Sequence, residues 1–439
     1  MKLDATKFRE QITAAQDYIW ANPETGYKEW KTHEYMKKVF LDLGYEITEA
    51  GNIPGFYTVI DTGRKGPEVL VMAEMDSLLC ANHPDADPET GAVHCCGHSA
   101  QCAAMVGIAS ALKEDGALDG LSGRIRLALV PAEELIEIGY RTQLRKQGII
   151  KYFGGKTEFL YRGYFDGVDI AFMIHSSLSD VFAVRPGSVG LVAKKVTYKG
   201  VSSHAGGSPW NGKNSLYAAT NGLSAANALR ETFKEEDLIR FHPIITEGGT
   251  AVNAIPEKTV IESYVRGKTY DAIIAANKNI NRALIGTALS LDTNIEISDM
   301  PGYAPLNNAE GMIKLFEDAV KGRGYPYQYL TTRGTGSTDM GDISGIMPAV
   351  HPYAPGAVGI SHGSNYYIKN IDTACVGSAN VQLEMLSLLL SKGGERAREI
   401  LENFTPQFES KEAYLSFIDS LVSEGERITY EDGKAIIRL

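Results

Sequence analysis

The chain has 439 residues, of which 44% are hydrophobic and 22% are charged, and its formal net charge is −11. This length exceeds one compact core, so two domains are expected, and the composition is that of an ordinary soluble globular protein. The acidic balance and the lack of a long basic run argue against nucleic acid and anionic membrane surfaces as partners.

The N-terminus and the cysteines indicate the compartment. Residues 1–5 lead into a mixed, charged helix and not into the apolar core of a signal peptide. No stretch of the sequence approaches the length of about 18 apolar residues that a membrane span requires. The five cysteines are odd in number and four cluster between residues 80 and 102, which suits a reduced compartment better than a disulfide framework. We therefore expect a cytoplasmic protein.

Helices and strands are expected to alternate over the first 175 residues. Helical spacing of apolar residues and short β-like runs identify each element, and Asn22-Pro23-Glu24 ends the first helix. The expected elements are helices over 6–20 and 29–43, strands over 55–60 and 69–73, a helix over 100–112, and strands over 124–130 and 168–174.

Potential ligands stand at the tips of the three interior strands. They are Glu74 and Asp76 after the first, Glu133 and Glu134 after the second, and His175 after the third. Open α/β sheets bind ligands beyond the carboxyl ends of their strands, so these side chains are candidates for one site. Adjacent residues of an extended segment face opposite ways, so Glu133 and Glu134 can take different roles, one binding metal and the other handling protons.

Cys96 and His98 are expected on the loop that leads into the helix over 100–112. Side chains two residues apart diverge on a helix but share one face of an extended segment, so this pair can share a ligand only outside a helix. A thiolate and an imidazole can close on a metal ion such as zinc. Buried small side chains are the structural alternative, and a redox or regulatory thiol site that includes Cys95 and Cys102 is another.

The pattern changes near residue 189. The expected elements are a strand over 189–199, a helix over 215–231, strands over 241–247 and 258–266, a helix over 270–290 and a strand over 294–298. This β-α-β-β-α-β order is that of a ferredoxin-like domain. We therefore expect residues 189–303 to be inserted into a first domain made of 1–188 and 304–439. The later elements are helices over 308–322 and 373–390, a strand near 349–353 and a hairpin over 428–437.

Seven short motifs occur in the order found in one group of metallohydrolases. They are Met75-Asp76-Ser77-Leu78, His94-Cys95-Cys96-Gly97-His98, Pro131-Ala132-Glu133-Glu134, His175, Ser203-His204-Ala205, Asn253-Ala254-Ile255-Pro256 and His362. On these motifs the chain resembles the aminoacylase and carboxypeptidase family of dinuclear metallopeptidases. Within that family it is similar to the amidohydrolase branch, which includes hippurate, indole-acetyl-amino-acid and p-aminobenzoyl-glutamate hydrolases.

The resemblance implies a mixed-sheet α/β metallohydrolase domain with an inserted ferredoxin-like dimerisation or lid domain. It also implies two divalent metal ions. Zinc is the expected metal, and manganese, cobalt and nickel are the alternatives. The implied metal ligands are Cys96, His98, Glu134, His175 and His362. Glu133 would act as general base and acid, and Asp76 would orient a ligand. His204 would reach the substrate carbonyl oxygen, often from the partner subunit of a homodimer, and Asn253 and Arg266 would hold the substrate carboxylate.

The activity implied is hydrolysis of the amide bond between an acyl group and an amino acid or short peptide. A dipeptidase or carboxypeptidase of the same family is one alternative, and a noncatalytic binding protein that retains the fold is another. The five ligand positions and Glu133 disfavour the noncatalytic alternative, because a protein released from catalysis need not keep them.

The chain departs from the branch at several places. Ser99 stands where the branch usually has aspartate, and Glu74 where it often has aspartate. The interval from Glu134 to His175 is long, and its charged residues, such as Arg141, predict a solvated face. The C-terminal tail also extends past the usual end.

Overall fold

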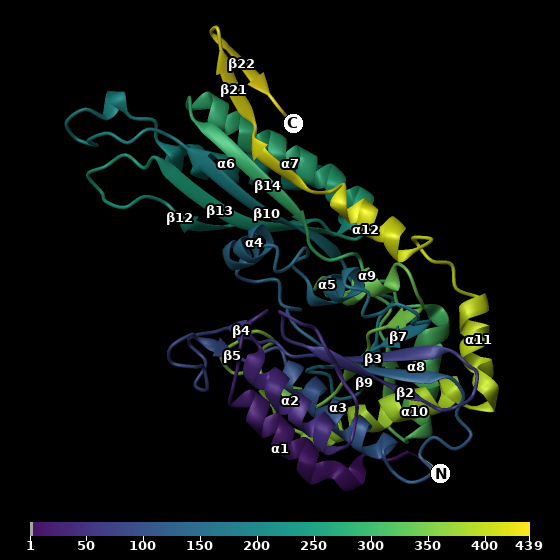
Figure 1. Cartoon of the computed structure of the whole chain (residues 1–439). Coiled ribbons are helices and arrows are strands. Elements are labelled where there is room, and N and C mark those ends of the chain that lie inside the picture. Colours follow the sequence, from purple (N-terminus) through teal and green to yellow (C-terminus); the bar gives the residue numbers. More distant parts are fainter. Residues whose placement is uncertain (1–2) are drawn as a thin grey trace. The chain divides into compact units, whose positions relative to one another are not determined.

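The computed structural model describes residues 3–439 and divides the chain into two compact units (Figure 1). Unit 1 comprises the described residues up to Gly187 together with Leu306–Gly334 and Thr338–Lys411. Unit 2 comprises Ser188–Pro305, Thr335–Ser337 and Glu412–Leu439. Each unit has its own sheet and its own hydrophobic core.

A mixed six-stranded sheet forms the centre of unit 1, in the order β1-β2-β6-β3-β7-β16. Its strands are β1 (Thr48–Glu49), β2 (Phe56–Asp61), β3 (Glu68–Glu74), β6 (Arg124–Val130), β7 (Ile170–Phe172) and β16 (Ala349–Val350). β3 runs parallel to both β6 and β7, whereas β2 is antiparallel to β6. Every residue of β3 is buried, as expected for an apolar interior strand covered on both faces. The prediction of a mixed α/β fold is confirmed.

Unit 1 also contains helices. They are α1 (Arg9–Trp20), α2 (Trp30–Asp42), α3 (His98–Leu112), α4 (Ile138–Lys146), α5 (Gly155–Tyr161), α8 (Glu310–Gly322), α9 (Met340–Ser344), α10 (Ser378–Leu390) and α11 (Glu395–Glu402). α3 packs against β3 and against α1 and α10, and it is buried along its whole length. A helix without a polar face belongs in a core, which explains the Ala-rich sequence of α3.

The segment Asp372–Leu390 is a π-helical turn that continues into α10. It is long and apolar enough to cross a membrane by length and composition, but 78% of the window is buried inside the fold. Leu383, Leu386 and Leu389 of this helix belong to the core of unit 1. Its apolar character is therefore explained by packing.

A second, four-stranded sheet in unit 1 has the order β15-β9-β17-β8. Its strands are β15 (Tyr327–Tyr329), β9 (Phe182–Val184), β17 (Tyr353–Ala354) and β8 (His175–Ser176). The single strand predicted over 168–174 is therefore shorter, and His175 begins a strand of another sheet. The backbone amide of His175 donates to Pro352 O at 2.9 Å, so the chain changes partners directly before this residue.

Unit 2 has an antiparallel sheet with two helices packed on it (Figure 1). Its elements are β10 (Gly190–Lys199), α6 (Ser215–Ala228), β11 (Arg240–Phe241), β12 (Ile244–Glu247), β13 (Lys258–Gly267), α7 (Tyr270–Ser290) and β14 (Asn294–Pro301). Asn214 and Thr269 cap α6 and α7 by accepting backbone N–H groups of the first turns. The predicted β-α-β-β-α-β order is present, and a dimerisation or lid role stays a prediction.

The C-terminal residues 412–439 belong to unit 2, whereas the sequence assigned them to the first domain. They form most of α12 (Lys411–Asp419), then β20 (Ser423–Glu426) and the hairpin of β21 (Ile428–Glu431) and β22 (Lys434–Ile437). β20 pairs with β14, and Ile428 is fully buried in the core of this unit. A strand from the C-terminal segment thus extends one edge of the ferredoxin-like sheet. No local sequence pattern predicts this pairing.

Candidate metal centre

The candidate ligands of unit 1 lie where strands end and where α3 begins. Glu133 and Glu134 follow the carboxyl end of β6, and His175 begins β8. His98 is the first residue of α3, so the helix begins two residues before the predicted start, and Cys96 lies on the loop before it. Cys96 and His98 therefore straddle a helix N-terminus instead of sharing one extended segment.

Gly97 permits this turn. Its φ of 94° is in the left-handed region, and a Cβ at this position would lie 2.1 Å from Ser176 Oγ and 2.3 Å from Tyr366 Oη. Both hydroxyl groups donate to the carbonyl oxygen of Cys96, at 3.5 and 3.1 Å. Glycine is therefore required both for the backbone conformation and for the close approach of the two hydroxyls.

Three groups of side chains bring their donor atoms within 4.8 Å of one another, and Cys96 belongs to two of them. The first consists of Cys96, His98 and His175, and Cys96 Sγ lies 3.3 Å from His175 Nε2. The second consists of Cys96, Glu134 and His362, and His362 Nε2 lies 3.5 Å from Glu134 Oε1. The structure thus gathers all five side chains predicted as ligands, with one thiol common to the two groups.

The Asp76 carboxylate contacts one residue of each group that contains Cys96. His98 Nδ1 lies 3.0 Å from Asp76 Oδ1, and the backbone amide of Glu134 donates to Asp76 Oδ2 at 2.7 Å. A carboxylate only accepts, so Nδ1 of His98 carries a proton toward Asp76, and Nε2 is the ring nitrogen that faces the group. Asp76 is fully buried, which fixes the orientation of both ligands.

The donor atoms fit divalent metal ions. Within residues 3–439, His98 Nε2 and Glu134 Oε1 are buried and take part in no hydrogen bond. Leaving such a group unpaired costs about 1–3 kcal/mol, and a bound cation would remove that cost. Burial, followed by the neighbouring His98, lowers the pKa of His175 to about 4, so this imidazole is neutral at pH 7. Thiolate, neutral imidazole and carboxylate together are a donor set for zinc and similar ions.

Glu133 lies beside the first group without belonging to it. Its Oε2 is 3.9 Å from His98 Nε2, and the residue is 7% exposed. Burial, and then the carboxylates of Glu74 and Glu134, raise the pKa of Glu133 well above its usual range. A carboxyl group whose pKa is raised in this way is suited to general acid and base chemistry.

Arg141 of α4 fixes the backbone that carries Glu133 and Glu134. Its Nη1 donates to Ala132 O at 3.3 Å and to Phe153 O at 2.5 Å, and its Nη2 donates to the carbonyl oxygen of Glu134. Ala132 has a positive φ of 59°, a conformation that requires such support. Arg141 is 1% exposed, so the prediction of a solvated face is wrong for this residue, because carbonyl groups replace water around its guanidinium.

Lys156 of α5 is a second buried cation from the same interval. Its Nζ contacts Glu74 Oε1 and Asp339 Oδ1, and all three side chains have 0% exposure. Burial, partly offset by Lys156, raises the pKa of Asp339 to about 6. Sequence reasoning missed Lys156 and Asp339 as partners; the only signal was the unusual length of the interval from Glu134 to His175.

The remaining predicted site residues belong to unit 2. His204 forms an isolated antiparallel β-bridge with Ala254, and the backbone amide of Ala205 donates to Asn253 O at 2.9 Å. His204 and Asn253 therefore lie on paired loops. Asn253 is exposed and His204 is exposed as well. Arg266 on β13 is partly buried and donates to His242 Nε2 at 3.1 Å and to Ser337 Oγ at 3.0 Å. Their roles toward a substrate stay predictions.

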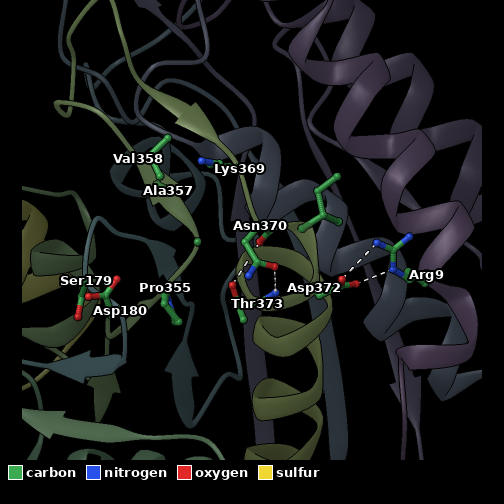
Figure 2. A pocket seen from close by; sticks show the side chains of 12 residues that line it. Arg9, Ser179, Asp180, Pro355, Ala357, Val358, Lys369, Asn370, Asp372 and Thr373 are labelled. Carbon is green, nitrogen blue, oxygen red and sulfur yellow. Dashed lines mark hydrogen bonds and ion pairs between the residues drawn. The ribbon is translucent and has the colours of Figure 1, made fainter.

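A surface cavity of about 490 Å³ in unit 1 shares no lining residue with these groups (Figure 2). Its wall includes the ion pair of Arg9 Nε with Asp372 Oδ1, 2.5 Å apart, whose side chains are 52% and 61% exposed. Solvent screens such exposed pairs, so this ion pair contributes little.

A mixed α/β unit that gathers thiol, imidazole and carboxylate groups at its strand ends has the architecture of a metal-dependent hydrolase. The model of peptidase family M20/M25/M40 matches residues 70–387, and the chain therefore belongs to this family. The predictions of this family and of a hydrolase of carbon–nitrogen bonds are confirmed.

Several known proteins are similar to the chain. Xaa-Arg dipeptidase of Mus musculus is 28% identical over 399 residues, covering 86% of this chain and 83% of that protein. N-acetyl-L-cysteine deacetylase of Bacillus subtilis is 27% identical over 336 residues, covering 72% of this chain and 74% of that protein. The Bacillus subtilis YXEP protein, a dinuclear metal-binding M20 peptidase, superposes with a TM-score of 0.65 at 19% identity, covering 88% of this chain and 99% of that one.

Proposed function

We propose that the chain hydrolyses the amide bond between an acyl group and an amino acid or short peptide, with two divalent metal ions. One observation carries this proposal: Cys96 is common to two groups of donor atoms, each within 4.8 Å. The first ion would be held by Cys96, His98 and His175, and the second by Cys96, Glu134 and His362. Family membership supports the reaction class.

When bound, the ions lower the pKa of a water molecule and polarise the scissile carbonyl group. The protein handles the proton: Glu133, close to His98 and with a raised pKa, accepts it from the water and returns it to the leaving amine. Asp76 keeps His98 in the tautomer that directs Nε2 at the metal position. Arg141 holds the carbonyl groups on both sides of Glu133, so that its carboxylate stays in place.

The substrate contacts that we propose for unit 2 are those of the sequence prediction. His204 would donate to the carbonyl oxygen, where negative charge develops. Asn253 and Arg266 would bind the substrate carboxylate, and the planar guanidinium is suited to a two-pronged contact. Support comes from the motifs that contain His204 and Asn253, and from the position that Arg266 shares with the family.

We further propose zinc as the metal and a cytoplasmic homodimer as the assembly. A thiolate with imidazoles suits zinc, and all five cysteines are free thiols. Large apolar side chains on the loops and helix of unit 2 are exposed, namely Trp210 at 78%, Tyr217 at 65% and Val252 at 103%. Exposed large apolar side chains are typical of protein–protein contacts, which supports the dimerisation role predicted for this unit.

Dipeptide hydrolysis is the second candidate activity, because a dipeptidase is among the similar proteins. The two candidates differ in whether the substrate carries a free amino group on its acyl side. The experiment measures amine release from a panel of N-acyl amino acids and dipeptides, with protein stripped by a chelator and reloaded with zinc, manganese or cobalt. Turnover that needs metal and falls by at least about 100-fold in Glu133→Gln would support the mechanism.

Two results would contradict the proposal. Turnover that persists without metal, or in Glu133→Gln, would refute the assigned base and metal centre. Stoichiometric metal binding without turnover of any substrate would favour the noncatalytic alternative.

A further inference from the structure

Glu74, the last residue of β3, directs its carboxylate at His98. Glu74 Oε2 lies 3.2 Å from His98 Nε2, and both side chains have 0% exposure. His98 Nδ1 lies 3.0 Å from Asp76 Oδ1, so Nε2 is the ring nitrogen that faces the Glu74 carboxylate. A cation between the two atoms, either a proton on Nε2 or a metal ion, makes this close approach of two buried groups favourable.

The distance is that of two donor atoms on one metal ion. With metal–nitrogen and metal–oxygen distances of about 2.1 Å, the two donors are separated by about 3.4 Å at a tetrahedral angle and by about 3.0 Å at a right angle. Moreover, donor atoms of Glu74, His98 and Glu133 lie within 4.8 Å of one another. The Glu74 oxygen therefore lies at the distance expected of a second donor to an ion bound by His98 Nε2.

Three contacts fix the Glu74 side chain in this position. Lys156 Nζ binds the other carboxylate oxygen, Oε1. Gln101 Nε2 donates to Oε2 at 2.8 Å, and Gln101 Oε1 accepts the backbone amide of Glu74 at 3.1 Å. Gln101 lies on α3, one turn after His98, so the helix that carries one ligand also orients the other. Lys156 balances part of the negative charge, with Asp339 as its second partner.

We propose that Glu74 is an additional oxygen ligand of the ion held by Cys96, His98 and His175, and that Lys156 is the residue that positions it. The inference rests on the proposed function for the presence of that ion. It gives the interval from Glu134 to His175 a role, because this interval supplies Lys156.

The test titrates chelator-stripped protein with Co²⁺ and records two readouts besides activity: the visible spectrum of the bound ion and the affinity in competition with a chelator. In Glu74→Gln, one of two ions should bind at least about 10-fold more weakly, with a changed spectrum, since even outer contacts of metal ligands are worth about 10–100-fold. Lys156→Gln should weaken the same ion by a smaller factor.

Glu68→Gln is the matched control. Glu68 is the first residue of β3, 2% exposed, and binds Arg126 at 2.5 Å, so this change removes a buried charged partner from the opposite end of the same strand. Glu68→Gln should lower the urea midpoint and leave both Co²⁺ affinities and the spectrum unchanged.

The outcomes separate the two proposals. Two Co²⁺ ions bound equally well by wild type and Glu74→Gln, with identical spectra, overturn this inference alone. Equal losses of affinity in Glu74→Gln and Glu68→Gln also overturn it, because the effect would then follow from stability. Failure of the wild type to bind two ions refutes the proposed function and this inference with it.

Discussion

Replacing Arg141 by methionine removes the guanidinium that supports the backbone around Glu133. The side chain donates to the carbonyl groups of Ala132, Phe153 and Glu134 and is 1% exposed. Hydrogen bonds from a charged donor contribute about 1.5–3 kcal/mol each, and a buried carbonyl left unpaired costs about 1–3 kcal/mol. Because methionine retains much of the apolar volume, we expect a loss of about 3–6 kcal/mol.

The same change should also slow catalysis. Ala132 has a φ of 59°, a strain of about 1–3 kcal/mol that the loop can release once its carbonyl is free. Glu133 would then move, and a displacement of about 1 Å at a reacting group costs about 100-fold in rate. Urea unfolding at about 25 °C measures the first effect, and kcat of the zinc-loaded enzyme at saturating substrate measures the second.

Lys146→Met is the matched control, because Lys146 is exposed on the same helix. It should change stability by less than about 0.5 kcal/mol and leave kcat unchanged. A folded Arg141→Met enzyme with the kcat of the wild type would refute the positioning role of Arg141. A loss of stability no larger than that of the control would refute the free-energy estimate.

Three further predictions concern other parts of the chain. Gly97→Ala should abolish stoichiometric Co²⁺ binding, because its Cβ would lie 2.1 Å from Ser176 Oγ; metal analysis that finds two ions contradicts this. In metal-free protein, Glu133→Gln should raise the urea midpoint at pH 8 but not near pH 4. Because the pKa of Glu133 is raised in the folded state, its stabilising contribution is present below the ordinary value of 4.5 and is lost as the pH rises. Equal urea midpoints of the two proteins at pH 8 would contradict this prediction. Truncation after residue 419 should lower the melting temperature by exposing the β14 edge and removing buried Ile428, which calorimetry can verify.

The sequence by itself determined the elements and the candidate ligands. The helix predicted over 270–290 and the strand over 124–130 have these bounds in the structure, because periods of 3.6 and 2 residues are local properties. Four of the five candidate ligands were predictable for a related reason: strand tips and a Cys-Gly-His turn are local, and parallel strands deliver their carboxyl ends to one edge of a sheet. His362 was implied only by the family resemblance.

Tertiary structure decided which charges are buried and where the chain ends pack. Arg141 resembles a surface arginine in the sequence, and only the carbonyl groups around it make burial favourable. Lys156 and Asp339 are 183 residues apart, and the strand that begins at His175 pairs with β17 from a distant segment. Burial of a charge depends on partners far along the chain, and a local pattern contains no information about them.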